Sequence, residues 1–145
     1  MMRALTPTPL QLFESQLAAA EKDWREGEKL LPEIEALEAV FCTELRDARE
    51  RALAYGELSA QQYRLATGHF RRGRRQKGLA KIARCNNFAN QARQARQERR
   101  AWGRRLYELC RMRHVINVRK EHYFRLCEAA RRLLPALDGR GLAVA

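Results

Sequence analysis

The side chains of this sequence that are best suited to chemistry are arginines, whose guanidinium groups are suited to binding phosphate. Between Arg64 and Arg105 the chain carries 14 basic residues and one acid, Glu98. A planar guanidinium donates two parallel hydrogen bonds to a phosphate group. Repulsion among so many like charges destabilises a folded chain unless a polyanion relieves it, and phosphate backbones release counterions when they bind such a surface. The pattern therefore indicates nucleic acid as a partner.

The basic residues gather in two segments of this stretch. Residues 71–78 combine four arginines and a lysine with two glycines, and glycine and like-charge crowding both disfavour a helix, so we expect a loop there. Residues 93–105 repeat arginine every three or four positions, which forms a stripe along one side of a helix. Such a stripe contacts the phosphate backbone and not base edges, so we expect binding without sequence preference. The predicted contact residues are Arg71, Arg72, Arg74, Arg75, Lys77, Lys81, Arg84, Arg93, Arg96, Arg99, Arg100, Arg104 and Arg105.

Other interpretations of the basic stretch stay open at this point. Arginine far outnumbers lysine, and a GC-rich genome produces that bias without any function, although it does not explain why no acid occurs between Arg64 and Gln97. A basic face can also dock on an acidic protein surface, which is the alternative of a helical interaction or inhibitor protein. The sequence does not distinguish DNA from RNA, or single strands from double strands.

Residues for other chemistry are sparse. The sequence contains no phosphate loop, no nucleophile elbow and no zinc-protease motif. Cys110 and His114 are spaced to share one side of a helix, but a structural zinc ion normally takes four ligands. The four cysteines form no CxxC pair, which favours free thiols over a disulfide framework. We therefore expect no enzymatic activity, no metal, no cofactor and no small-molecule substrate.

Helices are the elements expected to position the arginines. Isoleucine and valine together number seven, which is too few for a sheet. Thr8–Gln11 and Ser59–Gln62 match capping boxes, and apolar residues such as Ile34, Leu37 and Phe41 repeat at helical spacing. Glycine and proline at several points predict breaks. These signals predict an all-α antiparallel bundle of about five helices, beginning near residues 9, 32, 59, 79 and 119 and ending at Pro135.

The charge of the chain is divided unequally along its 145 residues. Residues 1–58 carry 7 basic and 12 acidic residues, and residues 59–145 carry 22 basic and 5 acidic residues. We expect a single domain in which 1–58 is an acidic helical hairpin and 59–145 is the basic part. No apolar run approaches the ~20 residues of a membrane span, and the N-terminal residues lack the pattern of a secretory signal. We therefore expect a cytoplasmic protein without a membrane partner.

A small, helical and basic chain without a catalytic motif resembles the small subunits of CRISPR effector complexes. The resemblance covers size, helicity and charge over most of the chain and includes no shared motif, so no residue role is transferred from that family. It implies a helical bundle that contacts DNA through basic surfaces beside other protein subunits. Nucleoid, plasmid-encoded and ribosome-associated proteins share the same features. The predicted function is that of a non-catalytic, sequence-independent nucleic-acid-binding subunit of a larger nucleoprotein assembly, DNA-binding or RNA-binding, with a role in antiviral defence if the assembly is a CRISPR complex.

Overall fold

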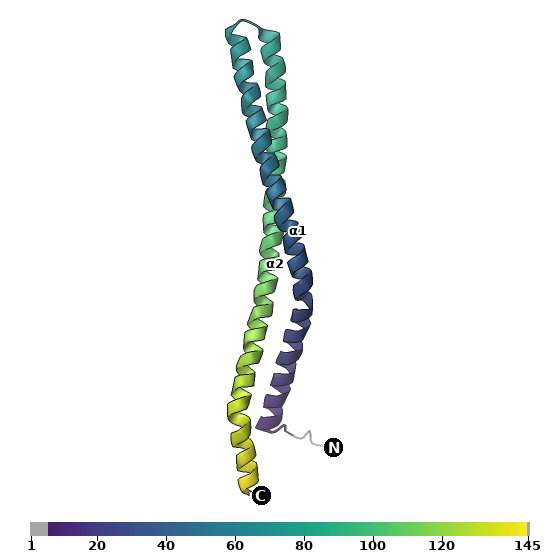
Figure 1. The fold of residues 1–145 in the computed structure, drawn as a ribbon, viewed down its shortest axis with the longest axis vertical. Helices are drawn as coiled ribbons and strands as arrows, with labels where there is room; N and C mark the ends of the chain where they lie inside the picture. Colours follow the sequence, from purple (N-terminus) through teal and green to yellow (C-terminus); the bar gives the residue numbers. More distant parts are fainter. Residues whose placement is uncertain (1–5, 145) are drawn as a thin grey trace. The chain divides into compact units, whose positions relative to one another are not determined.

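Two long helices joined by a short turn make up the computed structural model (Figure 1). Helix α1 spans Pro9–Arg71 and helix α2 spans Arg75–Val144. The structure describes residues 6–144, without the side chains of Leu134 and of residues 136–144. No strand occurs in this part of the chain, so the all-α prediction is confirmed. The prediction of about five helices in a bundle is wrong, because there are two.

An uninterrupted repeat explains why α1 does not break where glycine and proline predict it. Seam positions recur at alternating spacings of three and four residues from Leu10 to His69, which is the heptad pattern of a coiled coil. Pro32 lies within α1 and is exposed, so its ring is directed away from the seam. The buried and half-buried seam residues of α1 are Leu10, Phe13, Leu17, Ala20, Trp24, Gly27, Leu31, Ile34, Glu38, Phe41, Leu45, Ala48, Ala52, Tyr55, Ser59, Gln62, Ala66 and His69. Residues 9–58 consequently form no hairpin of their own.

Helix α2 carries a matching seam with the same alternating spacing. Two of its positions, Arg99 and Lys120, hold exposed cations. The remaining seam residues of α2 are buried or half-buried: Gly78, Lys81, Cys85, Phe88, Ala92, Ala95, Trp102, Leu106, Leu109, Arg113, Ile116, Tyr123, Cys127 and Ala130. The predicted helix start near residue 119 and the predicted end at Pro135 both lie inside α2. Over the described residues, neither helix has a segment apolar enough to serve as a membrane span.

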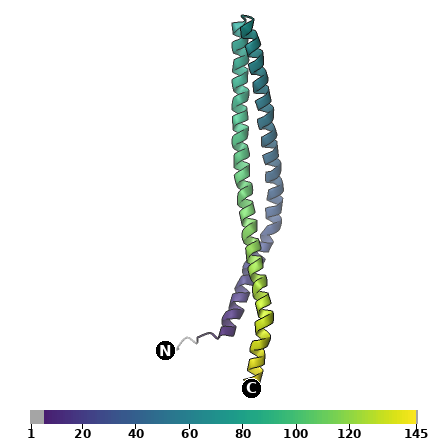
Figure 2. The same ribbon diagram turned by 90° about the vertical axis from the view of Figure 1, so that its left-hand side faces the viewer.

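The two helices divide into two compact units, which we call the hairpin unit, residues 36–109, and the terminal unit, residues 1–35 with 110–145. In the hairpin unit, residues 36–71 of α1 run antiparallel to residues 75–109 of α2, and both views of the chain show them side by side next to the turn (Figure 2). The sequence places 17 basic and seven acidic residues in the hairpin unit. All 13 predicted contact residues, from Arg71 to Arg105, therefore belong to the hairpin unit.

Aromatic pairs and a hydrogen bond fix the register of the hairpin unit. The rings of Phe41 and Trp102 are 5.2 Å apart between centroids, and those of Tyr55 and Phe88 are 6.4 Å apart. Ser59 Oγ donates to the carbonyl oxygen of Cys85 at 3.1 Å. Between these layers lie buried alanines, which let the backbones approach closely but bury little apolar area each. They are Ala48, Ala52, Ala92 and Ala95.

The terminal unit is held by an aromatic cluster and a close backbone approach. Trp24 stacks on Tyr123 with centroids 5.3 Å apart and also contacts Phe124 at 5.5 Å. Gly27 is buried, and a Cβ added there would lie 3.1 Å from Ile116 Cγ1. Gly27 therefore makes room for Ile116 within the seam, and α1 continues through it.

A glycine turn joins the helices. The N–H of Arg74 donates to His69 O at 2.9 Å and the N–H of Gly73 donates to Phe70 O at 3.1 Å, which together form a Schellman motif. Gly73 has φ of 73°, a left-handed conformation that other residues adopt only at a cost. The predicted loop over residues 71–78 is confirmed in position but is shorter, because only residues 72–74 are non-helical.

Two glycines five residues apart should respond oppositely to alanine. Gly73→Ala should lower the free energy of unfolding by about 1–2 kcal/mol, because the left-handed backbone conformation is strained with a Cβ. Gly68→Ala should raise it by up to about 1 kcal/mol, because alanine is the better helix former and a Cβ at Gly68 meets no atom within 4 Å. Urea unfolding followed by helical circular dichroism checks both. Equal effects of the two substitutions would contradict this account of the turn.

Candidate nucleic-acid interface

The end of the hairpin unit is free of acidic residues. Residues 58–97, which comprise the last part of α1, the turn and the first part of α2, include ten lysines and arginines and no aspartate or glutamate. The segment is bounded by Glu57 and Glu98, and Glu98 accepts a hydrogen bond from Arg51 at 2.8 Å. Of the 13 predicted contact residues, all are exposed except Lys81, which lies half-buried in the seam. The structure therefore leaves nearly all of the predicted cations accessible to a ligand.

Five of these cations surround the turn, and we call them the turn cluster: Arg71, Arg72, Arg74, Arg75 and Lys77. They lie within seven consecutive residues at the point where α1 ends and α2 begins. A Cβ added to Gly78 would lie 2.6 Å from Phe70 Cε1, so the Phe70 ring covers the first turn of α2. Phe70 thus packs across the turn on one side, while 42% of the residue stays exposed.

The pKa of His69 responds to the positive charges around the turn. Its Nδ1 atom is buried without a hydrogen-bond partner. Burial lowers the pKa of His69 below its usual value, and the neighbouring positive charges of Arg74, Lys77, Lys81 and Arg72 lower this pKa further. An anion bound at the turn cluster would remove part of this repulsion, so the protonation of His69 is coupled to anion binding.

A second group of cations forms a groove between the helices, which we call the arginine groove. Two adjoining hollows of the hairpin unit share Arg96 and Arg99 as lining residues. Arg49 lines one hollow and Arg100 lines the other. The groove therefore presents four guanidinium groups contributed by both helices and one carboxylate, Glu57, which lines the first hollow.

Small residues keep this groove open. Gly56 lines one hollow and Gly103 lines the other. A Cβ added at either glycine meets no atom within 4 Å, so both positions border open space. The floor includes Leu45 and Ala52 of the seam, and the exposed Arg99 replaces an apolar seam residue there. The arrangement is a shallow, positively charged groove with an apolar floor.

The turn cluster and the arginine groove lie far enough apart to contact one extended ligand. Arg75 and Arg96 are both on α2, where each residue advances 1.5 Å, so their backbones are about 30 Å apart. About nine base pairs of duplex cover that distance. The interface thus suits a polymer of phosphates better than a single small anion.

The structure adds detail on two arginines. Arg105, one of the predicted contacts, is exposed, and its guanidinium lies over the Trp102 ring, 4.4 Å from the centroid. Arg49 was not predicted, because its place in the groove depends on the pairing of α1 with α2. The signal that could have found it is the uninterrupted seam repeat, which predicts two long antiparallel helices.

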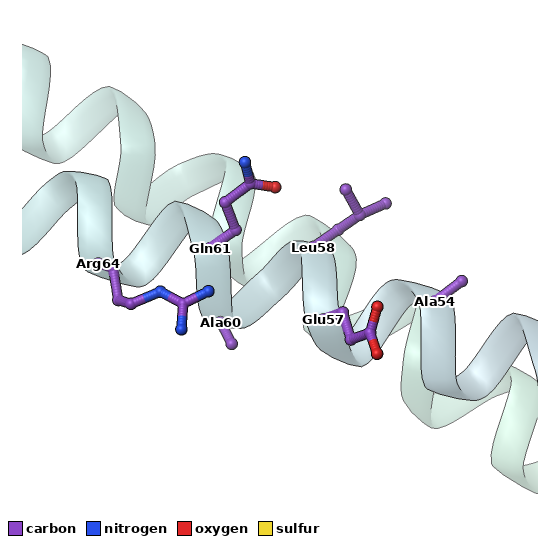
Figure 3. Close-up of a pocket in the computed structure, with 6 residues that line it drawn as sticks. All are labelled: Ala54, Glu57, Leu58, Ala60, Gln61 and Arg64. Atoms are coloured by element: carbon purple, nitrogen blue, oxygen red, sulfur yellow. The ribbon is translucent and has the colours of Figure 1, made fainter.

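A third hollow lies on α1 alone. Figure 3 shows its lining residues, all from one helix, with Glu57 and Arg64 as its charged side chains. Because Glu57 is the last acid before the acid-free segment, this hollow marks the edge of the basic region. A depression on one helix encloses little of any ligand, so we assign it no binding role.

Reactive side chains form no further site in the part of the chain that the structure describes. No three histidine, cysteine, aspartate or glutamate side chains gather there to hold a metal ion. The four cysteines are free thiols, and Cys42 and Cys110 are exposed. The resemblance to CRISPR small subunits stays a prediction. No protein-family model matches the chain, and the comparisons with curated proteins and with solved structures gave no significant match.

Proposed function

We propose that this protein binds nucleic acid through the phosphate backbone, without reading sequence and without catalysis, as a subunit of a larger nucleoprotein assembly. The observation that carries the proposal is the acid-free end of the hairpin unit, where ten lysines and arginines occur in residues 58–97 without an aspartate or glutamate. A surface that merely needs solubility normally mixes both signs of charge. The turn cluster and the arginine groove supply guanidinium forks along a length that one strand or duplex can follow.

Binding to phosphates has a thermodynamic signature that tests the proposal. The logarithm of the binding constant should fall linearly with the logarithm of salt concentration, with a slope of about −0.9 per phosphate contact on duplex and about −0.7 on single strands. Scrambling the sequence of the probe should leave the constant nearly unchanged, because backbone contacts carry no base information. Fluorescence anisotropy with labelled DNA and RNA, single- and double-stranded, measures both quantities.

His69 supplies a second readout that depends on position. Because bound phosphate relieves the repulsion by Arg72, Arg74 and Lys77, saturation with nucleic acid should raise the pKa of His69 toward its usual value. By linkage, binding should tighten as pH falls through this range. The stability of the free protein depends on pH in the opposite direction. Because the folded-state pKa of His69 is lowered, the free energy of unfolding decreases as pH falls through the unfolded pKa of about 6.5. Titration of the histidine ring signals by NMR measures the pKa of His69 in the free and in the bound protein.

Two outcomes would reject the proposal. Binding that ignores salt, or a preference among scrambled sequences of more than about a hundredfold, about 3 kcal/mol, would exclude backbone contacts. A chain that binds no nucleic acid but captures acidic proteins in a salt-sensitive way would be an interaction protein. Copurification of nucleic acid and of other subunits with the native protein identifies the assembly, with a CRISPR effector complex as one candidate.

A further inference from the structure

Helix α2 carries a second apolar row within the terminal unit. Met112, Val115 and Leu133 are exposed, and Leu126 and Ala129 between them are half-buried. They lie on a row of positions spaced alternately by three and four residues like the seam, and Arg119 and His122 hold the two positions of this row between Val115 and Leu126. The row is displaced by about 100° around the helix from the seam. A helix with two such rows has apolar faces for two neighbours. The seam faces α1, and no other part of the described chain covers the second row.

Helix α1 contributes to the same side of the terminal unit. In the hairpin unit, Arg51 and Glu98 directly precede seam positions 52 and 99 and form an ion pair, which shows that these two rows lie on one side of the helix pair. The corresponding rows of the terminal unit contain Leu30 and Asp23 on α1 and Met112 on α2. Leu30 is exposed, as is Leu12 further along α1. The apolar face therefore spans both helices.

The charges on the two halves of this face have opposite signs. Residues 9–35 of α1 carry seven acids and three bases, whereas residues 110–133 of α2 carry seven bases and two acids. Gly27 lies against Ile116, so Arg119, three residues further along α2, lies level with residue 24 of the antiparallel α1, next to the levels of Asp23 and Glu26. Asp23, Glu26 and Arg119 take part in no ion pair within the described residues. An acidic edge beside a basic edge is complementary to a second copy of itself.

We propose that two copies of this chain associate through the terminal unit. A twofold axis parallel to the helices places α1 of each copy on the second row of α2 in the other, antiparallel, and brings Asp23 of one copy level with Arg119 of its partner. The product is an isologous four-helix bundle. The small core of a separate helix pair favours this association, since the described residues include no large side chain that is fully buried.

A charge exchange tests the proposal on the full-length chain. Sedimentation velocity over a concentration series should show the wild-type chain dimerising. In the Arg119→Glu dimer, the new glutamate lies opposite Asp23 of the other copy, and in the Asp23→Arg dimer the new arginine lies opposite Arg119. Each variant alone then places like charges together and should dimerise at least about tenfold more weakly. An equimolar mixture of the two variants should recover a heterodimer, because both contacts then pair opposite charges. Arg131→Glu, at the opposite edge of α2, makes the same charge change outside the face and should leave the dimer intact.

Unaltered helical circular dichroism of each variant shows that it is folded before its association is compared. A wild-type chain that stays monomeric at the highest concentration reached overturns the proposal. The apolar face of the terminal unit would then be a surface for a helix of another protein. Dimerisation that neither single variant weakens, or a mixture that fails to recover it, overturns the proposed pairing as well.

Discussion

Neutralising the turn cluster should remove most of the affinity for nucleic acid while leaving the fold intact. Each phosphate contact contributes a factor of about eight to the binding constant at 0.1 M salt, so five lost contacts weaken binding on the order of 10⁴-fold. The salt slope on duplex should become less steep by about 4–5. All five side chains are exposed, and the Schellman turn that holds them depends on Gly73 and not on the cations. The substitutions are Arg71→Gln, Arg72→Gln, Arg74→Gln, Arg75→Gln and Lys77→Gln.

A matched variant separates local contact from overall charge. It removes five positive charges from the terminal unit, so its net charge equals that of the turn-cluster variant. If nucleic acid contacts the hairpin end, this control should lose little affinity and keep the wild-type salt slope. Equal losses in the two variants would mean that nucleic acid responds only to the mean charge of the chain. The control substitutions replace Lys22, Lys29, Arg125, Arg131 and Arg132 with glutamine.

The largest expected effect on stability comes from Ile34. Its side chain is 2% exposed and is the largest of the buried core residues in α1. Ile34→Ala removes three carbons from a tightly packed seam and should lower the free energy of unfolding by about 2–5 kcal/mol. Leu37→Ala is the matched control, because Leu37 is 44% exposed one turn further along the same helix. It should cost less than about 1 kcal/mol.

This pair also distinguishes the structure from the simpler sequence pattern. By spacing alone, Ile34 and Leu37 belong to one apolar stripe, which predicts similar losses of unfolding free energy from both alanine variants. The structure instead puts Glu38 at the seam position and exposes Leu37. Urea unfolding at low protein concentration measures the two free energies. Comparable losses of unfolding free energy in the two variants would show that Leu37 is part of the buried core and would contradict the structure.

Much of the helical content and of the seam could be predicted from the sequence. Ile34 and Phe41 lie inward as expected, because large apolar residues at helical spacing mark a helix face. The predicted helix ends are wrong because packing along the seam outweighs the preference of single glycines and prolines for a break. The seam continues through glycine at 27 and through polar residues at 38, 59 and 62, and those small or polar occupants conceal an unbroken heptad pattern.

The candidate site was predictable in composition but not in arrangement. Charge alone singles out the turn cluster, since its residues are neighbours in the chain and no packing is needed to bring them together. The arginine groove requires the register of two helices, because Arg49 and Arg96 are distant in sequence and meet only in the antiparallel pair. The contact of Arg105 with Trp102 needs no such register, because the two residues are three apart on α2.

The division of the chain into units has a consequence for the order of folding. The two halves of the hairpin unit are consecutive in sequence and are joined by a three-residue turn, so its contacts close short loops. The two halves of the terminal unit are separated by all of residues 36–109, and closing so long a loop costs more entropy. We expect the hairpin to form first, from the turn outward, and to bring the distant halves together. During synthesis, the basic end would then be folded before the last residues of α2 leave the ribosome.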